Sequence, residues 1–492
     1  MGNYSRLLVL ILPVVLIAGC INLGPDYERP NIPMPKSYYG IQAVNESIAD
    51  LEWWQLFEDP KLQLLITEAL RENRDLRQAI ARVNEVRARY YNVRADQFPA
   101  LDGSVGAGRG NMAEQVLPNG GIEDQYTASL RARYEVDLWG RYRRATESAR
   151  AELLGTEDNQ RAVLITLIAD VASTYLLLRD LDARVLISEE TLDARKDTTL
   201  IIQARYDHGT VPLLDVNQAQ IEEADAMSRL ATFRRQRQQA ENALSVLLGS
   251  SPRKIMRGRS LKGQIYPIEV PAGLPSVLLE RRPDIRAAEQ NLAAQTARIG
   301  VAKALRFPSI ALTANGGYIS DDLGDLIESD SKLWDIKLDI LGPIFDAGKR
   351  KAQVEVEIAR TEQALYEYEQ TILLALQEVE DSLAGIKYYR EELNARSFQL
   401  RAAKSASILS RARYDGGITD YLEVLDSDRS LFDAQLAQSA VERQELVSIV
   451  SLYKALGGGW LPSEPEKIDQ GEGEADQTQA ATTTHSVTGQ LQ

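Results

Sequence analysis

Long stretches of the chain place apolar residues at helical spacing and contain almost no helix breakers. Between Gly140 and Gly209 the only glycine is Gly155, and the residues around it are mainly Ala, Leu, Glu, Gln and Arg, which favour helices. Proline is absent from three windows, residues 119–211, 213–251 and 344–461. The pattern predicts helices far longer than those of ordinary globular domains. One of them, over residues 142–207, would be about 100 Å long at about 1.5 Å per residue.

Two regions instead alternate apolar and polar residues, with the period of two that is typical of strands. From Tyr126 to Leu138 every second residue is apolar and the residues between them are polar or charged, and Trp334–Ile340 shows the same pattern. The shorter alternating runs Leu101–Gly108 and Ile310–Tyr318 are the expected partner strands. Each pair of runs therefore predicts one β-hairpin.

The two predicted hairpins cover about residues 100–139 and 309–343, with polar connections at 109–124 and 320–332. Two interpretations stay open. The hairpins either pack on the helices of a soluble protein, or they contribute strands to a transmembrane barrel with an apolar face toward lipid and a charged face toward a watery lumen. Strands of about 9 to 11 residues match the span of an outer membrane. Because four strands cannot close a barrel, the second interpretation requires an oligomer.

The chain also repeats itself at an offset of 208 to 209 residues. Phe98-Pro99 recurs as Phe307-Pro308, and Ala204–Gly209 recurs as Ala412–Gly417 with one difference. Matches at this nearly constant offset indicate a tandem duplication of one large unit. We expect a first repeat at 61–258 and a second at 259–461, each with helices, one β-hairpin and a long helical hairpin, whose tips lie at about 206–214 and 414–422.

The two ends of the chain have compositions of their own. A short apolar run follows Arg6, and Ile17-Ala18-Gly19-Cys20 closes it with small residues, as in a lipoprotein signal. We expect a signal peptide at 1–19, acylation of Cys20, and an extended, lipid-anchored segment at 20–60. Residues 462–492 carry six acids and one Lys and are poor in large apolar groups, which predicts a disordered acidic tail.

Composition excludes several functions. With 71 acidic and 56 basic residues the net charge is −15, so the chain lacks the basic surface that nucleic-acid binding needs. A single Cys excludes an internal disulfide framework and Cys-based metal sites. The two histidines, His208 and His485, lie far apart in sequence, which argues against a His-based triad or a di-histidine metal site. Composition therefore argues against a nucleic-acid partner, a Cys- or His-based metal site and a His-based catalytic triad.

A series of short motifs runs in order from Cys20 to Trp460. It includes Gly24–Pro30, Trp53-Trp54 with Asp59-Pro60, Phe98-Pro99, Asp137–Arg141, Leu247–Gly249, Arg281–Ile285 and Pro343–Asp346. In its order and composition the series resembles the TolC-like outer-membrane efflux factors, in the lipoprotein branch that includes OprM and NodT.

The resemblance implies a mixed α+β membrane protein built from two tandem repeats. In a homotrimer, each protomer would give four strands to a twelve-stranded outer-membrane β-barrel, continued by a long periplasmic α-helical barrel. Such proteins are passive ducts of tripartite efflux systems. They dock to a periplasmic adaptor and an inner-membrane efflux pump, export drugs or other small molecules, and catalyse no reaction. A structural periplasmic coiled-coil lipoprotein without a pore is the alternative.

The second tip carries the candidate gate. Leu422 and Asp426 lie four residues apart, on one helical face, so three copies around an axis would form an apolar ring and an acidic ring. Such rings restrict a pore and favour cations. The resemblance implies that both residues line a periplasmic gate, with Glu423 beside them. The other interpretation places Leu422 in the core. By the same resemblance the adaptor-docking tips comprise Arg205, Tyr206, Gly209, Thr210, Arg413, Tyr414, Gly417 and Ile418.

Three smaller features have structural interpretations. The apolar stretch Val163–Leu178 contains Asp170, which indicates a packed helix face and not a membrane span. Asp26, Tyr27 and Arg29 are expected to fix the amino-terminal segment against the helices. A basic run is expected to be a solvated helix start or an interfacial anchor, and it consists of Arg141, Arg143 and Arg144.

Overall fold

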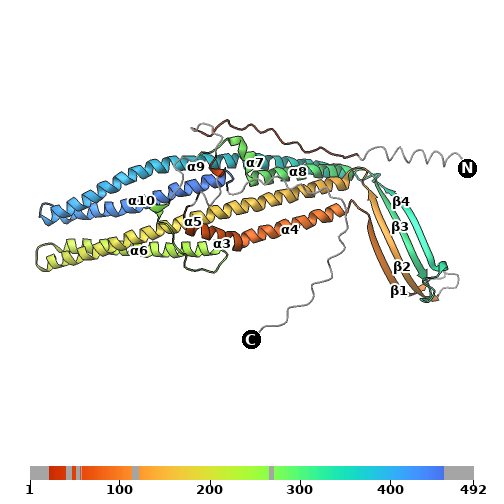
Figure 1. The fold of residues 1–492 in the computed structure, drawn as a ribbon, viewed down its shortest axis with the longest axis horizontal. Helices are drawn as coiled ribbons and strands as arrows, with labels where there is room; N and C mark the ends of the chain where they lie inside the picture. The colour runs from red at the N-terminus through yellow and green to blue at the C-terminus, as the bar shows by residue number, and fades with distance from the viewer. Residues whose placement is uncertain are drawn as a thin grey trace. The chain divides into compact units, whose positions relative to one another are not determined.

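Two helices of 67 residues each run through the chain, and both begin after a glycine in the left-handed region. Gly140 has φ 75° and Gly348 has φ 86°, a conformation that other residues rarely adopt. Each long helix turns back into a shorter one, and the two antiparallel pairs lie side by side in Figure 1. The four helices are α5 (Arg141–Asp207), α6 (Leu213–Leu247), α9 (Lys349–Asp415) and α10 (Tyr421–Ala455). The helix predicted over 142–207 is therefore confirmed.

The computed structural model describes residues 21–39, 47–50, 56, 58–112, 121–264 and 271–458. The expected signal peptide, the acylated Cys20, Trp53-Trp54 and the acidic tail lie outside the described residues.

Shorter helices precede each hairpin in both repeats. Pro60 and Pro283 stand at the first position of their helices, where the missing N–H of proline costs nothing. Asn73 accepts a hydrogen bond from the Leu76 N–H at 2.9 Å and so caps the second helix of the first repeat. The α-helices are α3 (Pro60–Glu72), α4 (Arg74–Ala95), α7 (Leu278–Arg281) and α8 (Pro283–Ala304). Single 3-10 turns are η1 (Ile48–Asp50), η2 (Leu261–Gly263), η3 (Pro275–Val277) and η4 (Ser329–Ser331).

The strands of both repeats form one antiparallel sheet, in the order β1-β2-β3-β4 (Figure 1). The strands are β1 (Ala100–Met112), β2 (Gly121–Val136), β3 (Ser309–Ser320) and β4 (Lys332–Leu341). The two hairpins share a register: Leu130 lies opposite Gly103, and Leu338 lies opposite Leu312. The central pair β2·β3 joins the two repeats.

The polar connection expected at 109–124 is wrong in its bounds. β1 continues to Met112 and β2 already begins at Gly121, with Arg109 paired to Asp124 in the ladder. These strand ends alternate poorly because they are rich in Gly, Asn and acids. Backbone hydrogen bonds hold them in the sheet regardless of side chain.

The main core surrounds the middle of α5 and α9, where α3, α8 and the ends of α6 and α10 pack together. Tyr175, Ile285, Ala375 and Leu452 are fully buried there. By length and composition α5 could cross a membrane, but half of its most apolar window is buried in the protein. We therefore interpret the stretch as a packed helix face.

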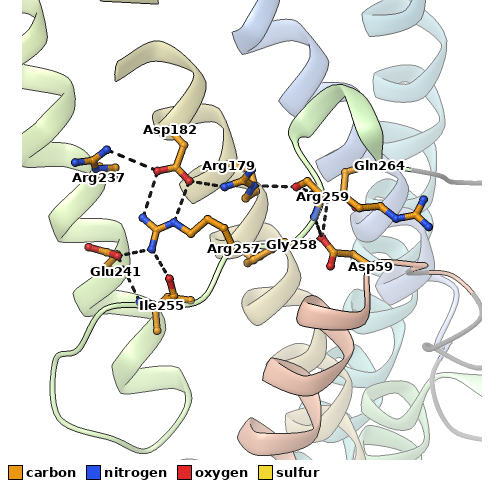
Figure 2. A network of polar contacts seen from close by, with 11 residues as sticks. Asp59, Arg179, Asp182, Arg237, Glu241, Ile255, Arg257, Gly258, Arg259 and Gln264 are labelled. Atoms are coloured by element: carbon orange, nitrogen blue, oxygen red, sulfur yellow. Dashed lines mark hydrogen bonds and ion pairs between the residues drawn. The ribbon is translucent and has the colours of Figure 1, made fainter. Parts of the chain in front are cut away.

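A buried carboxylate ties the start of α3 to a loop more than 190 residues away in sequence, as Figure 2 shows. Asp59 accepts hydrogen bonds from the Arg259 N–H and the Tyr175 hydroxyl, both at 2.9 Å, and from Gln264 Nε2 at 3.1 Å. It also caps α3 through the Lys61 N–H at 2.9 Å. A Cβ at Gly258 would lie 2.1 Å from this carboxylate, so the loop needs glycine there.

A second group of charges holds the adjoining part of the same loop, two residues before Arg259, to α5 and α6 (Figure 2). The Arg257 guanidinium donates to Asp182 at 3.0 Å and to Glu241 at 2.5 Å. Asp182 also accepts from Arg179 at 2.6 Å. The return from the first repeat toward the second is thus fixed on both sides.

The amino-terminal segment is fastened to the helices by its charged residues, as the sequence analysis expected. Arg29 forms two hydrogen bonds with Glu289, at 2.7 and 2.8 Å, and Tyr27 donates to the same carboxylate at 3.1 Å. Asp26 pairs with Arg144 at 2.6 Å. The expectation that Arg144 is solvated is wrong, because its side chain is 2% exposed and also donates to the Leu23 carbonyl at 3.1 Å.

Candidate channel and docking surfaces

One face of the sheet is apolar and stays exposed, so no described helix buries it. The alternation predicted from the sequence places its side chains in register across the strands, as in the row Leu101, Ala132, Ala314 and Ile336. The most exposed members of the face, each more than half accessible, are Leu101, Val105, Leu130, Trp334, Ile336, Leu338 and Ile340. A soluble hairpin packed on helices would bury this face; a lipid-facing strand leaves it bare.

The opposite face of the sheet is polar and connected across the strands. Arg131 donates to Asn315 at 2.8 Å, and Asn315 donates to Asp335 at 3.1 Å. Beside them, Arg133 pairs with Asp102 at 2.7 Å. Such a face is suited to water, and together the two faces match a barrel wall between lipid and lumen.

The candidate gate residues lie on an exposed face near the start of α10. Leu422 is 55% exposed and Asp426 is also exposed, whereas the neighbouring Tyr421, Val424 and Leu425 are buried. Leu422 is therefore not a core residue. The buried side chains belong to a small cluster between the two helical hairpins, with Ile202, Val216 and Ala219. The helix thus turns the two candidate residues outward on one side.

Glu423 is held in place by its own neighbours. Its carboxylate pairs with Arg413 at 3.1 Å and accepts from the Thr419 hydroxyl at 2.5 Å. Asp420 caps α10 through the Glu423 N–H at 3.4 Å. Glu423 therefore braces the second tip.

The two tips share one turn geometry, which the internal repeat predicts. Gly209 and Gly417 both have φ 70° and donate to the carbonyls of Tyr206 and Tyr414, at 2.8 and 3.0 Å. The residue after each glycine reaches one step further back: the Thr210 N–H donates to the Arg205 carbonyl and the Ile418 N–H to the Arg413 carbonyl, both at 2.9 Å. This pattern of helix ending requires a residue that tolerates positive φ.

The two tips also contact each other. Arg205 pairs with Asp415 at 3.0 Å, and its guanidinium lies over the Tyr414 ring, 5.0 Å from the centroid. Tyr414 packs in turn on Tyr421, with ring centroids 5.4 Å apart. Of the expected docking residues, Arg205 and Tyr414 therefore join the two hairpins, while Ile418 is 70% exposed.

Sequence reasoning missed a buried ionic cluster above the tips. Arg195 on α5 lies 3.4 Å from Glu222 on α6 and 4.0 Å from Asp428 on α10. Asp428 also pairs with Arg411 at 2.9 Å, and Arg429 pairs with Glu222. Only the placement of charges at core positions of α6 and α10 could have indicated it.

Asp215, the first-repeat counterpart of Glu423, lies in the first turn of α6. Burial, together with the nearby Asp420 carboxylate, raises the pKa of Asp215 above its ordinary value. In the part of the chain that the structure describes, no three His, Cys, Asp or Glu side chains converge as a metal-binding group.

A sheet with an uncovered apolar face, a polar opposite face and long attached helices defines the class of membrane channel subunits. Comparison with known proteins agrees. The family described as Outer membrane efflux protein matches residues 65–250 and 274–458, two segments that begin 209 and end 208 residues apart. The double match confirms the internal repeat.

Proteins similar to this chain are named as parts of efflux systems or as outer membrane channels. Over 465 residues the chain is 39% identical to the solvent efflux pump outer membrane protein SrpC of Pseudomonas putida. The alignment covers 92% of this chain and 98% of SrpC. It is 34% identical over 447 residues to the cation efflux system protein CusC of Escherichia coli, covering 90% and 97%. The solved open state of the MtrE outer membrane channel of Neisseria gonorrhoeae matches with a TM-score of 0.80 at 32% identity. The match covers 89% of this chain and 98% of the MtrE chain.

The chain therefore belongs to the outer membrane efflux protein family. It is an outer-membrane channel component of an efflux system, as the order of sequence motifs predicted.

Proposed function

We propose that three copies of the chain assemble into a passive duct, with a twelve-stranded barrel in the outer membrane and a helical tunnel in the periplasm. The observation that carries the proposal is the bare apolar face of the four-stranded sheet. A chain of this kind must find both lipid and neighbouring strands, because open sheet edges do not persist in a membrane.

The order of the strands supports closure by identical copies. β1 and β4 are the two free edges, and they run antiparallel because three antiparallel pairings separate them. The β4 edge of one copy can therefore pair with the β1 edge of the next without reversing the alternation. Two copies would give eight strands and three would give twelve. The likeness to the TolC-like family favours three.

The finer features of this duct belong to the same proposal. Leu422 and Asp426 line a periplasmic gate, and the tips dock to a periplasmic adaptor that connects to an inner-membrane pump. Their exposure on one side of α10 and at the helix turns supports these roles. Cys20 carries the lipid anchor in the outer membrane. The duct holds no cofactor and catalyses no reaction, and the cargo is set by the pump.

Native mass spectrometry of the protein extracted in detergent tests the assembly. We expect a trimer that remains in the membrane fraction through salt and alkaline washing, and that unfolds on heating to a monomer of different gel mobility. A monomer released by alkaline washing would instead favour the pore-free periplasmic lipoprotein.

A further inference from the structure

The loop between β4 and α9 presents two apolar side chains that nothing in the described chain covers. Ile344 is fully exposed and Phe345 is 90% exposed. The loop around them is held in shape, since Asp346 accepts from the Gly348 N–H at 3.0 Å and from the Arg350 N–H at 3.3 Å. Pro343 precedes the pair. The loop therefore offers a defined apolar surface at the junction of sheet and helices.

The first repeat shows what covers the equivalent junction. Trp139 lies in the loop between β2 and α5 and stacks on Phe307, with ring centroids 4.7 Å apart. The Trp139 indole N–H donates to the Pro308 carbonyl at 2.7 Å. The exit of the first hairpin is thus closed by the Phe-Pro pair that leads into the second hairpin.

The same Phe-Pro pair occurs at the entry to the first hairpin, as Phe98-Pro99, and this copy of it is bare. Phe98 is 58% exposed and Pro99 is exposed beside it. One chain therefore carries an uncovered exit loop at its β4 edge and an uncovered Phe-Pro pair at its β1 edge. At the offset that relates Gly140 to Gly348, the counterpart of Trp139 is Ala347, so Phe345, two residues earlier, would supply the aromatic contact that Trp139 makes with Phe307.

We propose that Ile344 and Phe345 pack against Leu101 and Phe98-Pro99 of a neighbouring copy of this chain. The proposal rests on the assembly proposed above and adds the residues and the strand register by which the copies meet. It makes the junction between copies a repetition of the junction between repeats.

The repeat also specifies the register. β3 corresponds to β1 at an offset of 209, as Phe307 does to Phe98, and the shared hairpin register then places Leu130 in correspondence with Leu338. Within the chain, Leu130 lies opposite Gly316 and Ala132 lies opposite Ala314.

Transferred to the edges between copies, these pairs bring two aliphatic residues of β4 opposite two of β1. Leu338 faces Ala107 of the neighbouring copy, and Ile340 faces its Val105. β4 ends at Leu341, so the loop with Ile344 lies beyond the paired strands, near the start of β1 and Leu101 of that copy. A slip of one residue would place these apolar side chains opposite polar-face positions, so the alternation of both strands supports the register.

Cysteine cross-linking of the full-length protein in its membrane tests the contact. Opposed residues in a non-hydrogen-bonded antiparallel pair have Cβ atoms about 4.5 to 5.5 Å apart, close to the reach of a disulfide. We choose two pairs, Val105→Cys with Ile340→Cys for the register and Phe98→Cys with Phe345→Cys for the junction. The controls are the four single variants and the pair Leu101→Cys with Ile340→Cys, which the register separates by four residues.

On mild oxidation, both test pairs should give covalent dimers and trimers on non-reducing gels. The controls should stay monomeric after denaturation. If native mass spectrometry shows trimers while neither test pair cross-links, the contact is wrong and the duct stands. If the Val105–Ile340 pair cross-links and the Phe98–Phe345 pair does not, the junction loop faces lipid. The register then stands, and the proposed contact of Ile344 and Phe345 with the neighbouring copy is wrong. If no oligomer forms from the wild-type chain, the proposed function fails together with the contact.

Discussion

Substituting Leu338 by Arg tests which face of the sheet meets lipid. Leu338 is 63% exposed on β4, opposite Leu312 and on the same face as Ile336 and Ile340. If this face contacts hydrocarbon, the arginine must be desolvated or must distort the bilayer around it. The arginine side chain would remain charged at any physiological pH.

The expected cost follows from the depth of the residue. Arginine on the lipid face of an outer-membrane barrel costs about 2 to 4 kcal/mol near the midplane and less near the interfaces. Three widely separated copies in one trimer act nearly independently, so the assembly should lose about 6 to 12 kcal/mol. We therefore expect a large drop in the yield of heat-modifiable trimer.

The neighbouring residue supplies the matched control. Asp339 lies one position further along β4, on the polar face, opposite Ala311. Asp339→Asn should assemble normally, and Asp339→Arg puts the same new side chain into the watery lumen. The assay is the fraction of folded trimer after refolding into lipid vesicles, and its loss in denaturant. Equal tolerance of Leu338→Arg and Asp339→Arg would refute the assignment of the faces.

Three further predictions concern other parts of the chain. Cys20→Ser should abolish acylation while trimers stay in the membrane, and mass analysis of the mature amino terminus checks it; an unmodified terminus at another residue would remove the anchor. Burial alone would raise the pKa of Asp59, but its four hydrogen bonds lower that pKa below the ordinary value of 3.8, so its stabilising effect is present above that pH and is lost as the pH falls further. Asp59→Ala should lower the free energy of unfolding by about 3 kcal/mol at pH 7, as expected for buried donors left unpaired, and by less at pH 3. A loss that does not depend on pH would contradict the role of the charge. Gly417→Ala, which meets no atom within 4 Å but must adopt φ 70°, should cost about 1 to 2 kcal/mol and weaken adaptor capture, and unchanged stability in denaturant would count against the turn geometry.

The long elements were predictable from sequence because their signal is repeated many times. The absence of proline and the scarcity of glycine predict α5 from residue 142, and the helix begins at Arg141. The alternation from Tyr126 predicts β2, which the structure extends back to Gly121. Strand ends rich in glycine and acids carry no such signal, since their backbone pairing is independent of side-chain pattern.

Individual buried charges could not be predicted, because their partners are distant in sequence. Arg144 looks like a solvated residue in a basic run, and only the folded chain brings Asp26 to it. Asp59 has a readable signal, an N-capping residue before a proline, but that signal does not reveal its bonds to Tyr175 and Arg259. Burial of Glu222 and Asp428 likewise depends on the packing of two hairpins.

The gate region shows the same division between local and distant information. Spacing alone places Leu422 and Asp426 on one face of a helix, and the structure shows both to be exposed. Spacing could not distinguish an exposed Leu422 from a core residue. The distinction comes from the cluster around Tyr421 and Leu425, which fills the space between the hairpins and turns the opposite side of α10 outward.

Single-channel recording in planar bilayers tests the central claim, that this chain forms a gated duct. The wild-type trimer should pass a small, cation-preferring current that multivalent cations block. The double variant Leu422→Ala with Asp426→Ala should conduct more and prefer cations less. Its first-repeat counterpart, Leu214→Ala with Gln218→Ala, should behave like the wild type. Absence of any channel from folded wild-type trimers would contradict the account.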